Sequence, residues 1–164
     1  MTSSSTTCRI REGSCTIVLD TQYWPVIITT WFGEANEAAI TRFFVENDAR
    51  VFARAQRERT PVVLISDAAH AERPSAKVRK VLADKTSSQS KDVEDLTLGS
   101  IIVVENALIR GAVTAMSWIL PRMKDMIVVG DIATAIDRAL ELLDDRRIVR
   151  PPMLSPARYR RPAA

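Results

Sequence analysis

Residues Gly99–Leu143 read GSIIVVENALIRGAVTAMSWILPRMKDMIVVGDIATAIDRALELL, and this stretch decides the fold. An apolar run, a helical run, a second apolar run and a second helical run follow one another with almost no loop between them. Apolar strands that alternate with helices indicate parallel β-α units. We therefore predict strands at Ser100–Val104 and Met126–Val129, a helix at Ala107–Leu120 that is capped by Asn106 and ends before Pro121, and a last helix capped by Asp131.

The chain upstream extends the same pattern. Cys15–Asp20 and Val26–Phe32 are β-branched runs joined by a short polar link, which predicts an antiparallel hairpin. Helical spacing of apolar residues over Glu34–Arg57 predicts a long amphipathic helix, Val62–Ser66 reads as a buried strand, and Ser75–Lys85 as a short helix. The predicted order is β-β-α-β-α-β-α-β-α. This is an α/β fold with a mixed, mostly parallel five-stranded sheet and about four helices.

Composition predicts a single domain with two tails. Residues 1–14 are rich in Ser and Thr and predict a flexible arm, residues 15–145 the α/β domain, and residues 146–164 a disordered tail rich in Arg and Pro. The tail holds six arginines and no acid, so without them the net charge of +3 becomes −3 for residues 1–145. The domain itself therefore offers no basic face for nucleic acid, and any binding of nucleic acid is expected to be weak and to involve only the tail.

Several chemistries find no support in the sequence. There is no GxSxG, Walker-type, GxGxxG or HExxH motif, and glycine is scarce, with five residues. Two cysteines and one histidine are too few soft ligands for a zinc site, so we expect no metal and no cofactor. No apolar stretch is long enough for a membrane span and no signal-peptide core is present, which makes a cytoplasmic location the default expectation.

The turn that follows Val62–Ser66 is the best candidate site, because open α/β sheets bind ligands at the carboxyl ends of their strands. We predict a loop at Asp67–Pro74, and the candidates are Asp67, His70, Arg73 and Ser75. His70 is a potential general base or an ordinary surface histidine, and Asp67 a potential orienting group or a common turn residue. Ser75 is either a phosphoacceptor at a helix N-terminus or simply the N-cap.

The predicted helix Ala107–Leu120 is apolar nearly all round, with Arg110 as its only charge. A helix buried in the centre of the domain explains this pattern. The alternative is an exposed apolar patch for a partner or for self-association, formed by Met116, Trp118 and Ile119 with Arg110 beside it.

Two segments carry a family resemblance. VVLISDAAHAERPSAKVRKVL and SIIVVENALIRGAVTAMSWILPRMKDMIVVGDIATAIDRAL resemble small bacterial domains of the STAS/SEC14-like class, which are SpoIIAA-like and of the anti-anti-sigma type. The resemblance covers roughly Cys15 to Leu143 and implies helices packed mainly on one side of the sheet, no cofactor, and binding to other proteins. It also implies that Ser75 is the position nearest to the family's phosphorylated serine, although ERPSAK stands where the family has an Asp-Ser-Ser-Gly-type turn.

The sequence thus favours a non-enzymatic, STAS-like regulatory or scaffold domain in a bacterial cytosol. Its expected partners are other proteins, and a second copy of the chain is one candidate. Three alternatives stay open. One is a sensor for a small molecule or lipid with a pocket at the strand ends, and another is an enzyme centred on His70 and Asp67. The third is an adaptor whose arginine tail binds an acidic partner.

Overall fold

The computed structural model describes residues 6–111 and 126–164 and contains a six-stranded sheet in the order β1-β2-β3-β4-β5-β6. The first three strands are antiparallel and β3 to β6 are parallel. The strands are β1 (Thr7–Glu12), β2 (Cys15–Asp20), β3 (Val26–Gly33), β4 (Val62–Ala71), β5 (Thr97–Val103) and β6 (Met126–Val129). The mixed, mostly parallel α/β architecture is confirmed, with one strand more than predicted.

The additional strand is β1, which lies within the expected flexible arm. It pairs with β2 from Thr7↔Asp20 to Glu12↔Cys15, and Gly13 turns the chain with a φ of 60°. Its side chains alternate, because Ile10 is buried while Arg9 and Arg11 are exposed. The polar composition of residues 1–14 conceals this alternation, and only residues 1–5 of that segment lie outside the described residues.

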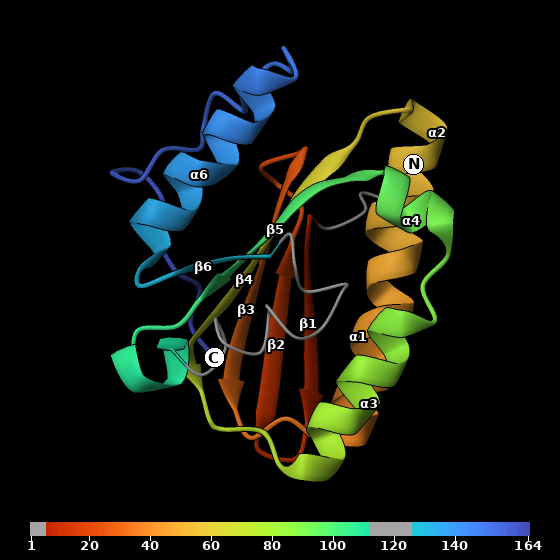
Figure 1. The fold of residues 1–164 in the computed structure, drawn as a ribbon, viewed down its shortest axis with the longest axis vertical. Coiled ribbons are helices and arrows are strands. Elements are labelled where there is room, and N and C mark those ends of the chain that lie inside the picture. Colours follow the sequence, from red (N-terminus) through yellow and green to blue (C-terminus); the bar gives the residue numbers. More distant parts are fainter. Residues whose placement is uncertain (1–5, 112–125) are drawn as a thin grey trace.

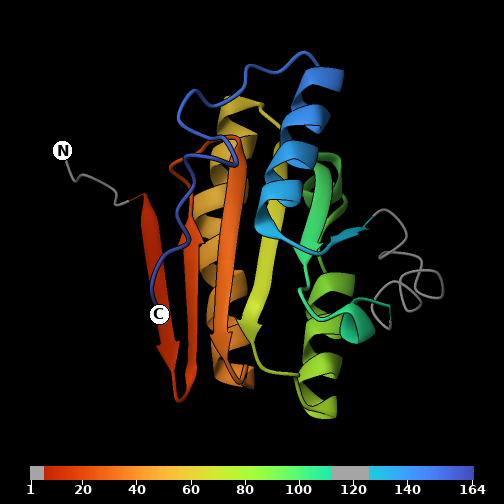
Figure 2. The same cartoon turned by 90° about the vertical axis from the view of Figure 1, so that its left-hand side faces the viewer.

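Most of the helices cover one face of the sheet (Figures 1 and 2). In chain order they are α1 (Glu37–Asn47), the π-helical turn η1 (Asp48–Phe52), α2 (Ala53–Glu58), α3 (Ala76–Ser87) and α4 (Lys91–Asp95). Asn36 caps α1 by accepting a hydrogen bond from the backbone N–H of Ala39 at 2.9 Å. The single helix predicted at Glu34–Arg57 is thus a continuous helical stretch with a π turn in its middle.

The opposite face is covered by α6 (Ile132–Asp145) and by the residues that follow it (Figure 2). Asp131 caps α6 through the N–H of Thr134 at 2.8 Å, as predicted. The helix buries an apolar stripe against the sheet, and the stripe consists of Ala135, Ile136, Ala139, Leu140 and Leu143.

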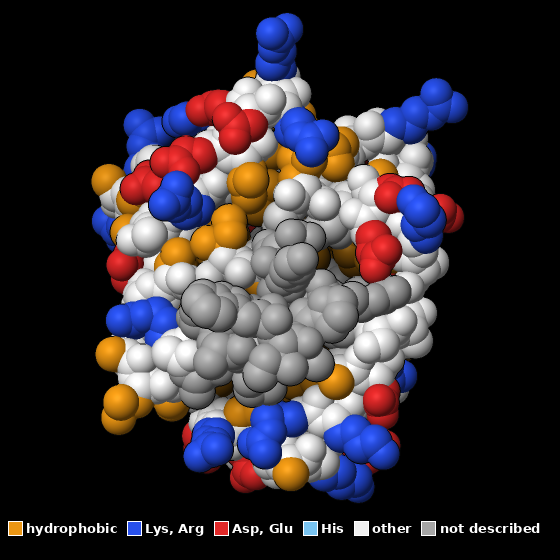
Figure 3. All heavy atoms as spheres, viewed as in Figure 1, with side chains coloured by type: hydrophobic (Ala, Val, Ile, Leu, Met, Phe, Trp, Pro, Cys, Tyr) orange, Lys and Arg blue, Asp and Glu red, His pale blue; other side chains and the backbone are white. Residues whose placement is uncertain are grey.

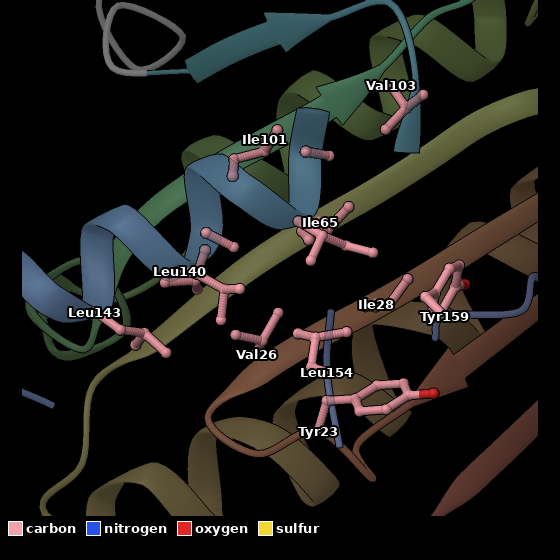
Figure 4. Packing of buried hydrophobic residues seen from close by; sticks show 14 of the residues in the cluster. Tyr23, Val26, Ile28, Ile65, Ile101, Val103, Leu140, Leu143, Leu154 and Tyr159 are labelled. Carbon is pink, nitrogen blue, oxygen red and sulfur yellow. The ribbon is translucent and has the colours of Figure 1, made fainter. Parts of the chain in front are cut away.

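Residues 148–164, which we name the C-terminal segment, also pack on this face. Leu154 is 4% exposed and Tyr159 is 6% exposed, and both belong to the same apolar cluster as Val26, Ile28 and Ile65 (Figure 4). Arg9 of β1 donates a hydrogen bond to the carbonyl of Ala163 at 2.6 Å. The prediction of a disordered tail is therefore wrong. The sequence does not reveal this packing, because Leu154 and Tyr159 follow no helical or strand spacing and the arginines around them dominate the composition of the segment.

The start of the helix predicted at Ala107–Leu120 agrees with the sequence. Asn106 accepts hydrogen bonds from the N–H groups of Leu108 and Ile109 at 3.0 and 3.2 Å, and residues 107–111 are helical. The remainder of the predicted helix Ala107–Leu120 lies outside the described residues. Among the described residues, no helix is long and apolar enough to cross a membrane.

Candidate functional site

The candidate site lies near the carboxyl ends of the parallel strands, on the face that the C-terminal segment covers. One register row crosses the sheet there, because Thr30 of β3 is paired with Asp67 of β4 and Asp67 with Val103 of β5. The strand β4 runs to Ala71, so Asp67 and His70 lie in a strand and the predicted loop is shorter. As a result Asp67 points into the interior and is 0% exposed.

Arg161 of the C-terminal segment neutralises the buried carboxylate. Its Nε lies 2.6 Å from Asp67 Oδ2 and its second terminal nitrogen lies 3.2 Å from Asp67 Oδ1, which is a two-point contact. The same guanidinium reaches Glu105 Oε1 at 3.4 Å. Burial lowers the pKa of Arg161, but the hydrogen bonds and charges of Asp67 and Glu105 outweigh burial and raise it. The arginine therefore stays charged in this position.

His70 joins the cluster from the solvent side. Its Nε2 is 3.3 Å from the first terminal nitrogen of Arg161, and its ring stacks on Phe32 with the centroids 5.6 Å apart and the planes at 5°. A guanidinium only donates, so His70 Nε2 is the acceptor in this contact. His70 is exposed, as the simpler interpretation of the sequence predicted, but it is held by two neighbours.

Tyr159 of the C-terminal segment lies close to Asp67 and Thr30. Its ring meets Tyr23 edge-on with centroids 5.9 Å apart. Burial raises the pKa of Tyr159 to about 12, while the nearby hydroxyl of Thr30 lowers it by a smaller amount. Thr30 is 1% exposed, and its Oγ1 makes no contact of full hydrogen-bond geometry with any described residue. The phenol of Tyr159 is thus close to the Thr30 hydroxyl but does not make a hydrogen bond of full geometry with it.

Ser75 and Arg73 lie apart from this cluster, at the start of α3. Ser75 is exposed and caps the helix by accepting a hydrogen bond from the N–H of Val78 at 3.2 Å. Arg79 folds back and donates to the carbonyl of Pro74 at 3.0 Å. Basic side chains gather at the lower end of the view in Figure 3, where Figure 1 draws the start of α3. The structure therefore divides the predicted site into a buried acidic part and an exposed basic part.

Arg110 lies at the same carboxyl-end edge, after β5. It donates to the carbonyls of Val104 at 2.9 Å and Glu105 at 3.3 Å. Its guanidinium also covers Gly130, where an added Cβ would lie 2.9 Å from it. Arg110 thus ties the start of its helix to β5 and to the end of β6. Met116, Trp118 and Ile119, the other residues of the predicted interaction surface, lie outside the described residues.

The described residues contain no group of three His, Cys, Asp or Glu side chains that could hold a metal ion. Two hollows on the surface of the described residues are both remote from the carboxyl ends of the strands. One lies between α1, η1 and the link from α3 to α4, where Phe44, Val45 and Val93 line it. The other lies beside α2 and α4, between Arg59 and Asp92.

Sequence reasoning missed the residues that complete the buried cluster, namely Thr30, Glu105, Tyr159 and Arg161. Register places Thr30 beside Asp67, and register across a crossover connection is hard to read from composition. One signal was available. A carboxylate inside an apolar strand requires a cation, because an unpaired buried charge is very costly. With Asp67 placed in the strand, the arginines of the C-terminal segment become candidates.

Comparisons with known proteins give a structural match. No protein-family model and no curated protein matches the chain. A protein of the DUF3478 family with a SpoIIAA-like fold, from Shewanella loihica PV-4, matches with a TM-score of 0.53 and 12% sequence identity, over 81% of this chain and 91% of that one. The fold of this chain is SpoIIAA-like, as the resemblance in the sequence predicted.

A second solved structure is similar at a lower level. It is an anti-sigma factor antagonist from Mycobacterium paratuberculosis, with a TM-score of 0.38 and 15% identity, and the match covers 82% of this chain and 93% of that one. We draw the assignment of the fold from the first match alone.

Proposed function

We propose that this chain is a non-enzymatic regulatory domain that binds a protein partner through the start of α3, in a bacterial cytoplasm. The observation that carries the proposal is the exposed Ser75, which caps the helix that follows a central strand of a SpoIIAA-like fold. This is the place where the sequence resemblance implies a regulatory serine.

The surroundings of Ser75 suit both a partner and a phosphate. Four exposed cations lie near Ser75 in the chain, namely Arg73, Lys77, Arg79 and Lys80, and Lys77 pairs with Glu37 at 3.2 Å. The helix α3 buries only Val78. A phosphate at this position would meet free N–H groups and the positive end of the helix dipole, with Arg79 held close by. An acidic partner surface would be attracted by the same charges. We therefore infer that Ser75 is a phosphoacceptor and that phosphorylation changes the charge which the partner meets.

The buried cluster supports a role without catalysis. Asp67 is engaged by Arg161 at both oxygens, and His70 is stacked on Phe32 with its Nε2 directed at the same guanidinium. A general base needs a free lone pair within reach of a substrate. Asp67 is fully buried and the Nε2 of His70 faces Arg161, so neither group presents a lone pair to a substrate in solution, which speaks against an enzyme centred on His70 and Asp67.

Photo-crosslinking tests the proposal. A benzophenone amino acid at Lys80 should capture a discrete protein from the cell extract, whereas one at Arg57, on the exposed side of α2, should not. Arg79→Glu should reduce the capture at Lys80 by about ten-fold, which is the loss of one charge-assisted contact. Equal capture at both positions, or capture that is insensitive to Arg79→Glu, would contradict the α3 surface.

Two variants of Ser75 isolate the effect of charge. Asp and Asn are both good N-caps, so Ser75→Asp and Ser75→Asn should leave the stability of α3 unchanged. Only Ser75→Asp adds a negative charge. We expect it to change the amount of captured partner, while Ser75→Asn behaves like the unmodified chain. A change of the same size in both variants would indicate that the partner recognises the Ser75 hydroxyl and not the charge at this position.

Self-association through Met116, Trp118 and Ile119 is a second part of this proposal. Light scattering after size-exclusion chromatography tests it, with Trp118→Ser as the variant. A dimer that Trp118→Ser dissociates would support the surface. A monomer at all concentrations would refute it.

A further inference from the structure

The sheet face beneath the C-terminal segment, which we name the groove, is covered by a segment that is neither helix nor strand. Its floor is apolar and buried, with Val26, Ile28 and Ile65 in contact with Leu154 and Tyr159 (Figure 4). At its far end lies the fully buried carboxylate of Asp67, with Glu105 nearby. The segment that lies in the groove pairs with no strand, so that side chains provide most of its attachment.

These side chains define what the groove recognises. Tyr159 occupies an apolar position against Tyr23, and Arg161, two residues later, places its planar fork on both oxygens of Asp67. A lysine would offer one point charge and no fork, so a buried carboxylate of this geometry favours arginine. The ligand chemistry is therefore an extended peptide with an aromatic residue followed two positions later by arginine.

The segment of this chain does not satisfy the groove completely. Thr30 Oγ1 is buried in the same register row as Asp67 and has no partner of full hydrogen-bond geometry among the described residues. Burying a hydroxyl without a partner costs free energy. A peptide whose donor or acceptor is better placed than the Tyr159 hydroxyl would satisfy Thr30 in addition to Asp67.

The segment is attached at a few points. It leaves α6 at Arg147, whose φ of 56° lies in the left-handed region. Val149 and Met153 are 85% and 67% exposed and contribute little to its attachment. A segment that is held by a few side chains opens at a lower free-energy cost than an element of the core does.

We propose that this groove is a binding site for an extended segment of a protein partner that carries an aromatic residue and, two residues later, an arginine, and that residues 154–161 of this chain occupy it as an intramolecular competitor. The site lies on the face of the sheet opposite α3, so it does not depend on the proposed function of Ser75.

The test uses a fluorescent peptide with the sequence of residues 150–164 and the full-length chain. In the double variant Tyr159→Ala/Arg161→Ala the internal segment is weakened, and circular dichroism checks that this variant is folded. The peptide should bind it at least about ten-fold more tightly than it binds the unmodified chain, because a tethered competitor acts at an effective concentration of about millimolar. Arg158→Ala, an exposed position in the same segment, is the matched control and should bind as weakly as the unmodified chain.

Changes in the peptide and in the groove test the chemistry. A peptide with Arg161→Gln should bind the double variant about ten-fold or more weakly, and adding Asp67→Asn to the chain should abolish this difference. If the double variant does not fold, Arg161→Lys alone replaces it as the weakened chain. Equal binding to all chains, or equal binding of the Arg and Gln peptides, would overturn the proposal. Exchange of labelled segments between two copies of the unmodified chain would assign the groove to a second copy and overturn the assignment to a partner.

Discussion

The helix α6 and the C-terminal segment cover the same face of the sheet by different means. The helix buries a continuous stripe from Ala135 to Leu143, with side chains one turn apart and an N-cap at Asp131. The C-terminal segment buries Leu154 and Tyr159 and adds a two-point ion pair from Arg161 to Asp67. The helix is held by apolar contact along its length, whereas the segment is held at a few points.

The difference shows what each region contributes to the molecule. Apolar burial is non-directional and gives α6 a large stabilisation that tolerates small shifts. An ion pair with a buried carboxylate is directional, and each partner depends on the other. We therefore expect α6 to belong to the cooperative core and the C-terminal segment to open separately.

The first prediction, which has the largest expected effect, concerns the stability that α6 contributes. Ile136 is 0% exposed, and Ile136→Ala leaves a cavity between the helix and the sheet. The free energy of unfolding should fall by about 3–4 kcal/mol, measured by urea denaturation. Arg138→Ala, on the exposed side of the same helix, is the control and should cost less than about 0.5 kcal/mol. If Ile136→Ala is no worse than Arg138→Ala, then α6 is not part of the core.

The sequence was informative where structure is periodic. The apolar stripe of α6, the caps at Ser75 and Asp131, and the continuous apolar runs of β4 and β5 are local patterns, and each predicted its element. The bounds of the two strands differ, because β4 continues to Ala71 and β5 begins at Thr97. These patterns sufficed for the mixed α/β fold, because strand and helix alternation leaves few topologies.

The missed parts depend on contacts between distant residues. Arg161 and Asp67 are 94 residues apart, and the local sequence around either residue does not indicate which residue it pairs with. The strand β1 was missed because Arg9 and Arg11 alternate with Cys8 and Ile10 in a Ser- and Thr-rich segment. Ser75 was predicted as an N-cap and is one, but its proposed phosphorylation depends on a partner that a single chain does not contain.

The second prediction removes the point attachment of the C-terminal segment. Arg161→Ala leaves the carboxylate of Asp67 buried without its partner, and since Arg161 is itself 23% exposed we expect a cost of about 3 kcal/mol, at the lower end for broken buried pairs. Hydrogen exchange should show that the amide of Tyr159 loses protection while those of α6 keep theirs.

A double-mutant cycle isolates this ion pair. Asp67→Asn removes the buried charge, so Arg161→Ala should cost much less in the Asp67→Asn background than in the unmodified chain. Equal costs in both backgrounds would mean that Arg161 acts through packing alone.

The third prediction concerns alkaline pH. Burial raises the pKa of Tyr159 from 10 to about 12, so the buried phenol keeps its proton at higher pH than a free one does. The stabilisation from the neutral phenol is complete below pH 10 and is lost as the pH rises through 12, at a cost of about 2–3 kcal/mol for a shift of this size. The measurement is the free energy of unfolding between pH 9 and about pH 12. Tyr159→Phe should lack this part of the pH dependence, and an identical curve for both chains would contradict the assignment.

The smallest expected effect tests whether the segment is attached only where its buried side chains are. Met153 is 67% exposed and Arg158 is also exposed, so Met153→Ser and Arg158→Ala remove little contact with the sheet. Each should change the free energy of unfolding by less than about 0.5 kcal/mol and leave hydrogen exchange at Tyr159 unchanged. A larger loss at either position would mean that the segment is held along its whole length, as α6 is. In that case the groove would have no ready way to open for a competing peptide.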